Sequence, residues 1–351
     1  MSRDPDIIVI GAGPNGLVAA AMLARAGLQV LVLEASEHIG GAVRTEELTS
    51  PGFRHDPFSA FYPFARVGPI SDLPLQHYGL EWCGWHRPYG GGAPTSTGVA
   101  QEMRLDGSIR NFERAQPGDG AGWRELYNWW EWGGEAFLSL LFHPLGHPAP
   151  FLKGAPLLRT PGKLMQFAQL ASGSARALTE RFLQGEDARI WVMGSVLHSD
   201  LIPDDAGGGG FGLILCGLSQ QVGMPVPKGG AQAIPDALAS FLRAHGAHIL
   251  TGERATRIVV RGKRAVAVKT ADAEYPAKHA IVATVQPQAL FLDLVGKHQL
   301  PADFITLVHR YRWGTGVFQL NCALSDLPQF RGEQLQNTLV LHLARSVDEL
   351  S

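Results

Sequence analysis

The alternation of apolar and polar segments at the start of the chain predicts a strand, a helix and a second strand. Residues 7–10 are four consecutive β-branched residues between a polar residue and a glycine, which is typical of a strand buried on both faces of a parallel sheet. Residues 17–26 are rich in Ala, Leu and Met and stop before Gly27, as a helix does. The apolar run 29–34 predicts the second strand. Together these segments form a βαβ unit of about thirty residues.

A glycine motif occupies the turn between the first strand and the helix. Gly11, Gly13 and Gly16 form G-x-G-x-x-G. The first glycine permits a tight turn, the second lets a diphosphate approach the backbone, and the third lets helix and strand pack closely. Pro14 and Asn15 begin the helix, whose first N–H groups and positive dipole end favour a phosphate. This context predicts a dinucleotide site.

An acidic residue closes the second strand. Glu34 lies 18 residues beyond Gly16, close to the spacing of about twenty at which a carboxylate binds the ribose hydroxyls. We assign the adjoining Ala35 to the same site. Since a carboxylate repels a 2′-phosphate, the pattern favours an adenine dinucleotide without one.

The same glycine spacing recurs at 207–212 in a different context. It follows Pro203-Asp204-Asp205 rather than a strand, and no acidic strand end lies at the right distance. We therefore predict a flexible loop at 207–212 and no nucleotide site.

A second glycine pair follows the acidic residue. Gly40 and Gly41 are succeeded by Arg44 and Thr45, and here the chain resembles the phytoene desaturase-like, amine-oxidase-type flavoproteins, most closely the phytoene dehydrogenase-related oxidoreductases. In that family the pair approaches the FAD diphosphate and is followed by Arg and, three positions on, by Ser or Thr. Ala42 stands at the arginine position here. The role of Arg44 is therefore open between a phosphate contact and a solvated side chain.

The resemblance returns after residue 220. Residues 223–230, followed by a predicted helix at 231–245, look like the family's P-x-G-G segment, which re-enters the FAD domain. Beyond them a strand is predicted to start at 248–250. Residues 254–260 and 264–268 then predict paired strands of a β-meander around a turn at 262–263.

The family resemblance also assigns residues in this later part of the chain. By resemblance, the backbone around Ala255 would face the adenine, and Ala283 and Thr284 would return to the nucleotide site. From physical pattern alone, the segments that contain these residues are equally well explained as core.

These elements predict an α/β fold with two interleaved domains. The first is a Rossmann-like FAD-binding domain with a parallel sheet and a β-meander, formed by 1–69 and 221–290. The second is an α+β substrate domain, formed by 70–220 and 291–351. We expect a helix over Trp123–Leu141 and sheet strands at Gly316–Leu324 and Leu339–Leu343. The many aromatic residues of this domain could line an apolar cavity or simply form its core.

The composition of the chain limits the kinds of partner and ligand that it is expected to bind. Thirty basic and 32 acidic residues give a net charge of −2 without a basic cluster, which argues against nucleic acid. Three distant cysteines predict neither disulfides nor a redox pair, and no metal-site spacing is present. We expect a cytoplasmic protein, with a peripheral membrane contact left open, and the sequence predicts no oligomeric state.

The resemblance implies an FAD-dependent oxidoreductase of the dehydrogenase, desaturase or isomerase type that acts on an apolar, polyene or isoprenoid substrate. The alternative is a non-catalytic binding protein on the same scaffold, like the Rab GDP-dissociation inhibitors. No catalytic residue is assigned. His55 lies in a stretch that resembles the family's flavin-facing loop, and the adjacent His198-Ser199-Asp200 is discounted as a triad because triad groups meet through the fold.

The end of the chain carries one further expectation. Relatives in this family continue with a glycine-rich segment that closes over the flavin, and nothing similar follows residues 282–287 here. We therefore expect the FAD domain to lack its final segment, which would lower stability and flavin affinity.

Overall fold

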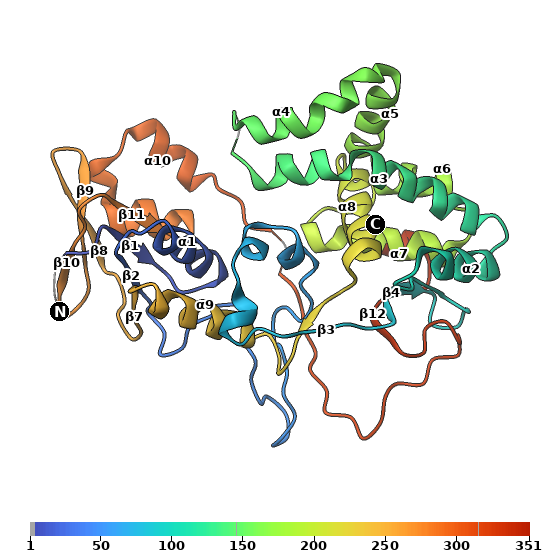
Figure 1. Ribbon diagram of the computed structural model, residues 1–351, viewed down its shortest axis with the longest axis horizontal. Coiled ribbons are helices and arrows are strands. Elements are labelled where there is room, and N and C mark those ends of the chain that lie inside the picture. Colours follow the sequence, from blue (N-terminus) through green and yellow to red (C-terminus); the bar gives the residue numbers. More distant parts are fainter. Residues whose placement is uncertain (1–3, 145, 315) are drawn as a thin grey trace. The chain divides into compact units, whose positions relative to one another are not determined.

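The computed structural model describes residues 4–144, 146–314 and 316–351 (Figure 1). The chain divides into two compact units. The first unit contains the residues up to Phe61, Ile70–Trp82 and Val226–Ala323, and the second contains Tyr62–Pro69, Cys83–Pro225 and Leu324–Ser351. Short strands lie where the chain passes between the units, β3 (Trp82–Cys83) and β6 (Val226–Pro227).

A four-stranded parallel sheet is the centre of the first unit. The strand order is β11-β1-β2-β7, and every neighbouring pair is parallel. The bounds are β1 (Ile7–Ile10), β2 (Val30–Leu33), β7 (His248–Leu250) and β11 (Ala280–Ala283). All residues of β1 and β2 are buried, as the uninterrupted apolar runs predict for strands covered on both faces. The predicted βαβ unit is therefore confirmed.

Helices and a meander cover this sheet. Ile8 and Ile10 of β1 pack in one cluster with Ile258 and Val268, which belong to the meander. The meander has the order β10-β9-β8 and is antiparallel. The remaining elements of this unit are α1 (Pro14–Arg25), η3 (Leu75–Tyr78), α9 (Ala233–Ala244), β8 (Arg257–Arg261), β9 (Arg264–Lys269), β10 (Glu274–Pro276), the π-helix η6 (Ala289–Gly296), η7 (Lys297–Gln299) and α10 (Ala302–His309). The first meander strand begins at Arg257 rather than at residue 254.

The second unit packs helices against a small mixed sheet. Its strand order is β12-β4-β5, with β12 parallel to β4 and β4 antiparallel to β5. The elements are η1 (Pro63–Arg66), β4 (Arg87–Gly92), β5 (Val99–Ala100), α2 (Leu105–Ala115), α3 (Asp119–Phe142), α4 (Pro148–Gly154), η4 (Ala155–Arg159), α5 (Pro161–Ser172), α6 (Ala175–Phe182), α7 (Glu186–Val196), η5 (Leu197–Ser199), α8 (Gly208–Val222), β12 (Thr338–Leu343) and η8 (Val347–Leu350), while η2 (Pro69–Asp72) begins at its boundary. The helix expected over Trp123–Leu141 is confirmed as α3.

Aromatic side chains form the core of this unit. Trp123 and Trp191 are fully buried, and their rings cross edge to face with centroids 5.0 Å apart. Phe112 stacks on Trp123 at 5.7 Å. These three aromatic residues therefore form part of the core of the second unit. Across the described part of the chain, none of the helices is both long and apolar enough to cross a bilayer.

The prediction of a flexible loop at 207–212 is wrong. Gly207 is the N-cap of the buried helix α8, and residues 208–212 are the first residues of that helix. Its glycines permit close helix packing. A Cβ atom on Gly209 would lie 2.3 Å from the backbone oxygen of Leu170, and one on Gly217 would lie 2.4 Å from the Trp130 ring. The predicted absence of a strand before this motif is correct, since η5 and a turn precede α8.

The strand predicted at Gly316–Leu324 is also wrong. These residues have no strand partner and belong, up to Ala323, to the first unit. Val317 and Phe318 are both 90 % exposed, so the apolar alternation there is not buried by a sheet. The other predicted strand, at Leu339–Leu343, is confirmed as β12.

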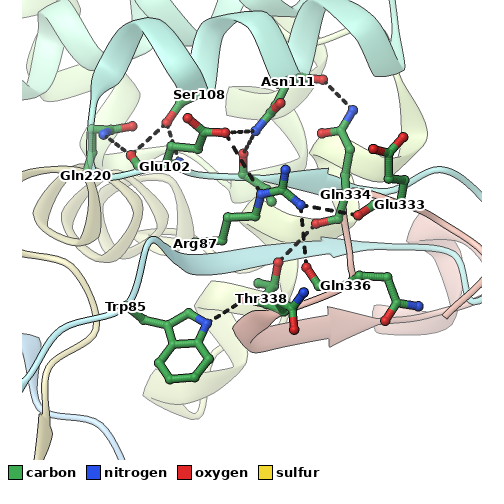
Figure 2. A network of polar contacts seen from close by, with 12 residues as sticks. Trp85, Arg87, Glu102, Ser108, Asn111, Gln220, Glu333, Gln334, Gln336 and Thr338 are labelled. Carbon is green, nitrogen blue, oxygen red and sulfur yellow. Dashed lines mark hydrogen bonds and ion pairs between the residues drawn. The ribbon is translucent and has the colours of Figure 1, made fainter. Parts of the chain in front are cut away.

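A polar network holds the returning segment 333–338 on the second unit (Figure 2). Arg87 of β4 donates to the backbone oxygens of Glu333 and Gln336, at 3.3 and 3.5 Å. The buried Gln334 side chain donates to the Asn111 oxygen at 2.9 Å. The bonds to Gln336 and Asn111 satisfy half-buried and buried polar groups, so the network helps to hold β12 in its register beside β4.

Candidate dinucleotide-binding site

The glycine turn after β1 leaves the start of α1 open. Gly11 has a φ of +102°, and its N–H donates to the Leu33 oxygen at 2.8 Å. A Cβ atom on Gly16 would lie 2.0 Å from the Gly11 oxygen, so the third glycine is required for close packing. A Cβ atom on Gly13 would meet nothing within 4 Å. No side chain caps the helix at Gly13, and the first N–H groups, from Asn15 onward, follow Pro14.

Glu34 connects the end of β2 with this turn. Its Oε2 accepts a hydrogen bond from the Ala12 N–H at 2.6 Å, and its Oε1 accepts one from the Ser36 N–H at 2.8 Å. A carboxylate oxygen has two acceptor positions, so each oxygen can still accept a hydroxyl. The neighbouring Ala35 is exposed. This geometry fits a ribose whose hydroxyls donate to Glu34.

The second glycine pair packs directly on the first motif. The Gly40 N–H donates to the Ala12 oxygen at 2.8 Å. A Cβ atom on Gly41 would lie 3.1 Å from the Cα of Gly13, and both Gly40 and Gly41 have positive φ angles. Two glycine turns that are separated in the sequence by α1 and β2 therefore lie against each other in the structure.

Thr45 connects this region with the start of α9. Its hydroxyl donates to Asp56 Oδ1 at 2.6 Å and accepts from the Gln232 N–H at 3.1 Å. The same Asp56 oxygen accepts from the Ala231 N–H at 2.9 Å. Sequence reasoning gave Asp56 no role, although its position beside His55 in a predicted family loop was a usable signal. Asp56 and Thr45 position the Gly229–Gly230 turn.

Arg44 has local partners. It forms an ion pair with Glu46, donates to the Gly41 oxygen at 3.4 Å, and lies with its guanidinium 4.9 Å from the centre of the Phe58 ring. To the two alternatives left by the sequence, the structure adds a third, in which Arg44 stiffens the loop after the glycine pair. The nearby His55 contacts Thr49 through Nε2 at 2.7 Å.

The later chain returns to the site through β11. Ala283 pairs with Ile10 in the sheet, and the Thr284 hydroxyl donates to the Ile10 oxygen at 3.1 Å. A Cβ atom on Gly11 would lie 2.8 Å from that hydroxyl oxygen, so Thr284 lies against the first glycine turn. Ala255 is half-buried against the cluster that includes Leu33. Its predicted role beside an adenine is not tested by these contacts.

Comparison with known proteins agrees with this geometry. Residues 9–68 match the model of an NAD(P)-binding Rossmann-like domain, and residues 159–323 match the model of the flavin-containing amine oxidoreductases. These matches imply FAD as the cofactor.

Two curated relatives and one solved structure illustrate how similar this chain is to known proteins. Pyridine nucleotide-disulfide oxidoreductase domain-containing protein 2 of Rattus norvegicus is 27 % identical over 93 % of this chain and 61 % of its own length. A component of the limonene dehydrogenase of Castellaniella defragrans is 37 % identical over 35 % of this chain and 22 % of its own. The structure of cyclohexylamine oxidase from Brevibacterium oxydans is 19 % identical, with a TM-score of 0.52 over 88 % of this chain and 63 % of its own. The chain thus spans about three fifths of the first relative.

The second unit contains an apolar groove. It has a volume of about 370 Å³ and is formed by α3, α4, η4 and α5. Every lining residue has an apolar side chain or is a glycine, among them Phe137, Leu157 and Phe167. A groove without charged or hydrogen-bonding side chains favours an apolar ligand.

Proposed function

We propose that this chain binds FAD and acts as an oxidoreductase on an apolar substrate. The observation that carries the proposal is the contact of the Gly40-Gly41 turn with Gly13 beside the open N-terminus of α1. When bound, the flavin supplies the hydride chemistry. The chain's own residues bind and orient the cofactor.

Each part of the site has a proposed task. The first N–H groups of α1, from Asn15 and Gly16, attract the diphosphate. Glu34 accepts the ribose hydroxyls through the acceptor positions that Ala12 and Ser36 leave free. Thr284 holds the turn at Gly11 in place from the opposite side. A non-catalytic binding protein on this scaffold would not require this set.

Two observations support an apolar substrate. The groove of the second unit is lined by apolar side chains, and one relative is named for a hydrocarbon substrate, limonene. Other relatives are named as amine or amino acid oxidases, so amines are the competing substrate class. Members of the polyene or isoprenoid class are the substrates that we propose.

Anaerobic reduction of the FAD-loaded protein tests the substrate class. We expect absorbance of the oxidised flavin to bleach with an isoprenoid hydrocarbon or polyene dispersed in detergent. Detergent alone, a primary amine and an L-amino acid should leave the spectrum unchanged. Bleaching by an amine or amino acid, without a response to the hydrocarbons, would overturn the apolar assignment and leave FAD binding intact.

A further inference from the structure

We propose that the second unit docks on an anionic lipid bilayer through the surface of α4, η4 and the adjoining ends of α3 and α5. Six large apolar side chains are exposed there, between 55 % and 72 % of their possible area. This apolar patch consists of Leu140, Leu141, Phe151, Leu152, Leu158 and Met165. Contiguous exposed apolar groups of this size usually mark an interaction surface.

The charge of the same segment selects the partner. From Ala136 to Thr179, 44 consecutive residues contain no Asp or Glu. The chain as a whole carries 32 acidic residues in 351, so a stretch of this length would ordinarily contain about four. Lys153, Arg159 and Lys163 lie within the stretch. Glu135 pairs with Lys153, so Arg159 and Lys163 give the patch its net positive charge beside the apolar groups. This combination is typical of segments that lie in the interface of an anionic membrane.

The cations are placed at the rim of the apolar patch. Lys153 follows Phe151 and Leu152 on α4 and also forms an exposed ion pair with Glu135. The Lys163 amine lies 4.8 Å from the centre of the Trp132 ring. Arg159 is exposed at the end of η4. Long basic side chains with an apolar stem can reach lipid headgroups while neighbouring apolar groups enter the acyl region.

A second copy of the chain fits this surface less well than a bilayer does. In a two-fold contact the same patch would face itself, so the cationic segments of both copies would meet and repel each other. An anionic bilayer instead offers both the opposite charge and an apolar interior. Figure 1 places α4 and α5 at one edge of the second unit, across α3 from β4 and β12. Their inner faces pack on α3 and α8, and their outer faces carry the exposed apolar patch.

Vesicle sedimentation tests the proposal without any cofactor or substrate. The wild-type chain should bind vesicles of phosphatidylglycerol and phosphatidylcholine, and bind far less to phosphatidylcholine alone. The triple variant Phe151→Ser, Leu152→Ser, Leu158→Ser should lower the partition coefficient at least about tenfold, because it removes the groups that enter the acyl region. Single changes Arg159→Gln and Lys163→Gln should each lower it about fivefold.

The control variant removes apolar side chains that lie outside the patch and are more exposed than those of the patch. The double variant Val317→Ser, Phe318→Ser should bind vesicles like the wild type, and thermal unfolding should show that all variants fold. Absence of binding to anionic vesicles, equal binding to neutral ones, or equal losses in the triple and control variants would overturn the proposal. So would a dimer that the triple variant dissociates without a change in vesicle binding.

Discussion

At Gly13 the absence of a side chain leaves space that no other protein atom fills. We predict that Gly13→Ala weakens FAD binding at least about tenfold, since the methyl group would occupy the position where the diphosphate approaches the backbone. The free energy of unfolding should fall by no more than about 1 kcal/mol, the range for a change at a helix N-cap. Titration with FAD and urea unfolding measure the two quantities. Loss of stability with unchanged FAD affinity would contradict the assignment.

Gly16 provides the contrasting case at the same turn. A Cβ atom there would lie 2.0 Å from the Gly11 oxygen, so Gly16→Ala should destabilise the first unit itself. The sequence motif assigns close packing to the third glycine, and the structure gives Gly16 that contact, whereas Gly13 faces open space.

Glu34 both holds the glycine turn and, in our proposal, binds the ribose. Glu34→Ala should weaken FAD binding by about 1 to 3 kcal/mol, the range for leaving a buried polar contact unmade. Glu37→Ala, an exposed acidic residue three positions later, is the matched control. Isothermal titration with FAD compares them, and an equal effect of both changes would show that overall charge, not the ribose contact, is responsible.

Among the elements, β12 carries the most strongly perturbed histidine. Burial, and to a smaller extent neighbouring His198, lowers the pKa of His342 to about 4, while the hydrogen bond to the Trp191 oxygen opposes this shift. His342 also contacts the Tyr89 hydroxyl, and its Nε2 lies 3.0 Å from that of His198. The pKa of His198 is also lowered by burial. Within the fold, His342 is therefore neutral at pH 7.

The pKa of His342 is lower in the folded state than in the unfolded state, where it is about 6.5. Above that pH the side chain is neutral in both states, and the contribution to stability is complete. As the pH falls toward 4, the unfolded state binds a proton that the folded state does not, so that stability is lost. Between pH 7 and pH 5 the free energy of unfolding of the wild type should fall by about 2 kcal/mol more than that of the His342→Gln variant. Urea unfolding followed by tryptophan fluorescence suits this test, because most tryptophans lie in the second unit. His86→Gln, at an exposed position, should behave as the wild type. Identical pH profiles in all three proteins would refute the role of His342.

The elements also show what sequence patterns can predict. The strands at 7–10 and 30–33 were predictable because both of their faces are buried, which requires continuous apolar runs. The glycine-rich start of α8 was not predictable, because glycine is usually unfavourable in a helix. The close contact with Leu170 that explains a glycine there is visible only in the structure. The apolar alternation at 316–324 resembles a strand pattern, but no neighbouring strand in the described chain pairs with it. Glu34 was found from its spacing, and Gly40 and Gly41 were found from the family resemblance. Asp56 was missed because it acts through contacts that are distant in sequence.

At the scale of the whole molecule, the chain alternates between its two compact units, as the two predicted domains also do. The boundaries differ from the predicted ones, because residues 291–323 and 70–82 group with the first unit, and residues 62–69 and 221–225 group with the second. Leu294 of η6 explains the first difference, since it is buried in the same cluster as Ile8 and Leu33. All the candidate site residues fall within the first unit. Cofactor binding should therefore stabilise that unit directly, by mass action.

Equilibrium dialysis of the purified chain against FAD, FMN and NAD tests the central claim most directly. The account predicts saturable binding of one FAD per chain, with clearly weaker binding of FMN, which lacks the adenosine half that Glu34 and the glycine turn address. NAD should bind more weakly than FAD, because it shares the ADP half and the diphosphate but lacks the ribityl chain and the isoalloxazine ring that the rest of an FAD site would contact. Tight stoichiometric binding of NAD with no binding of FAD would contradict the account.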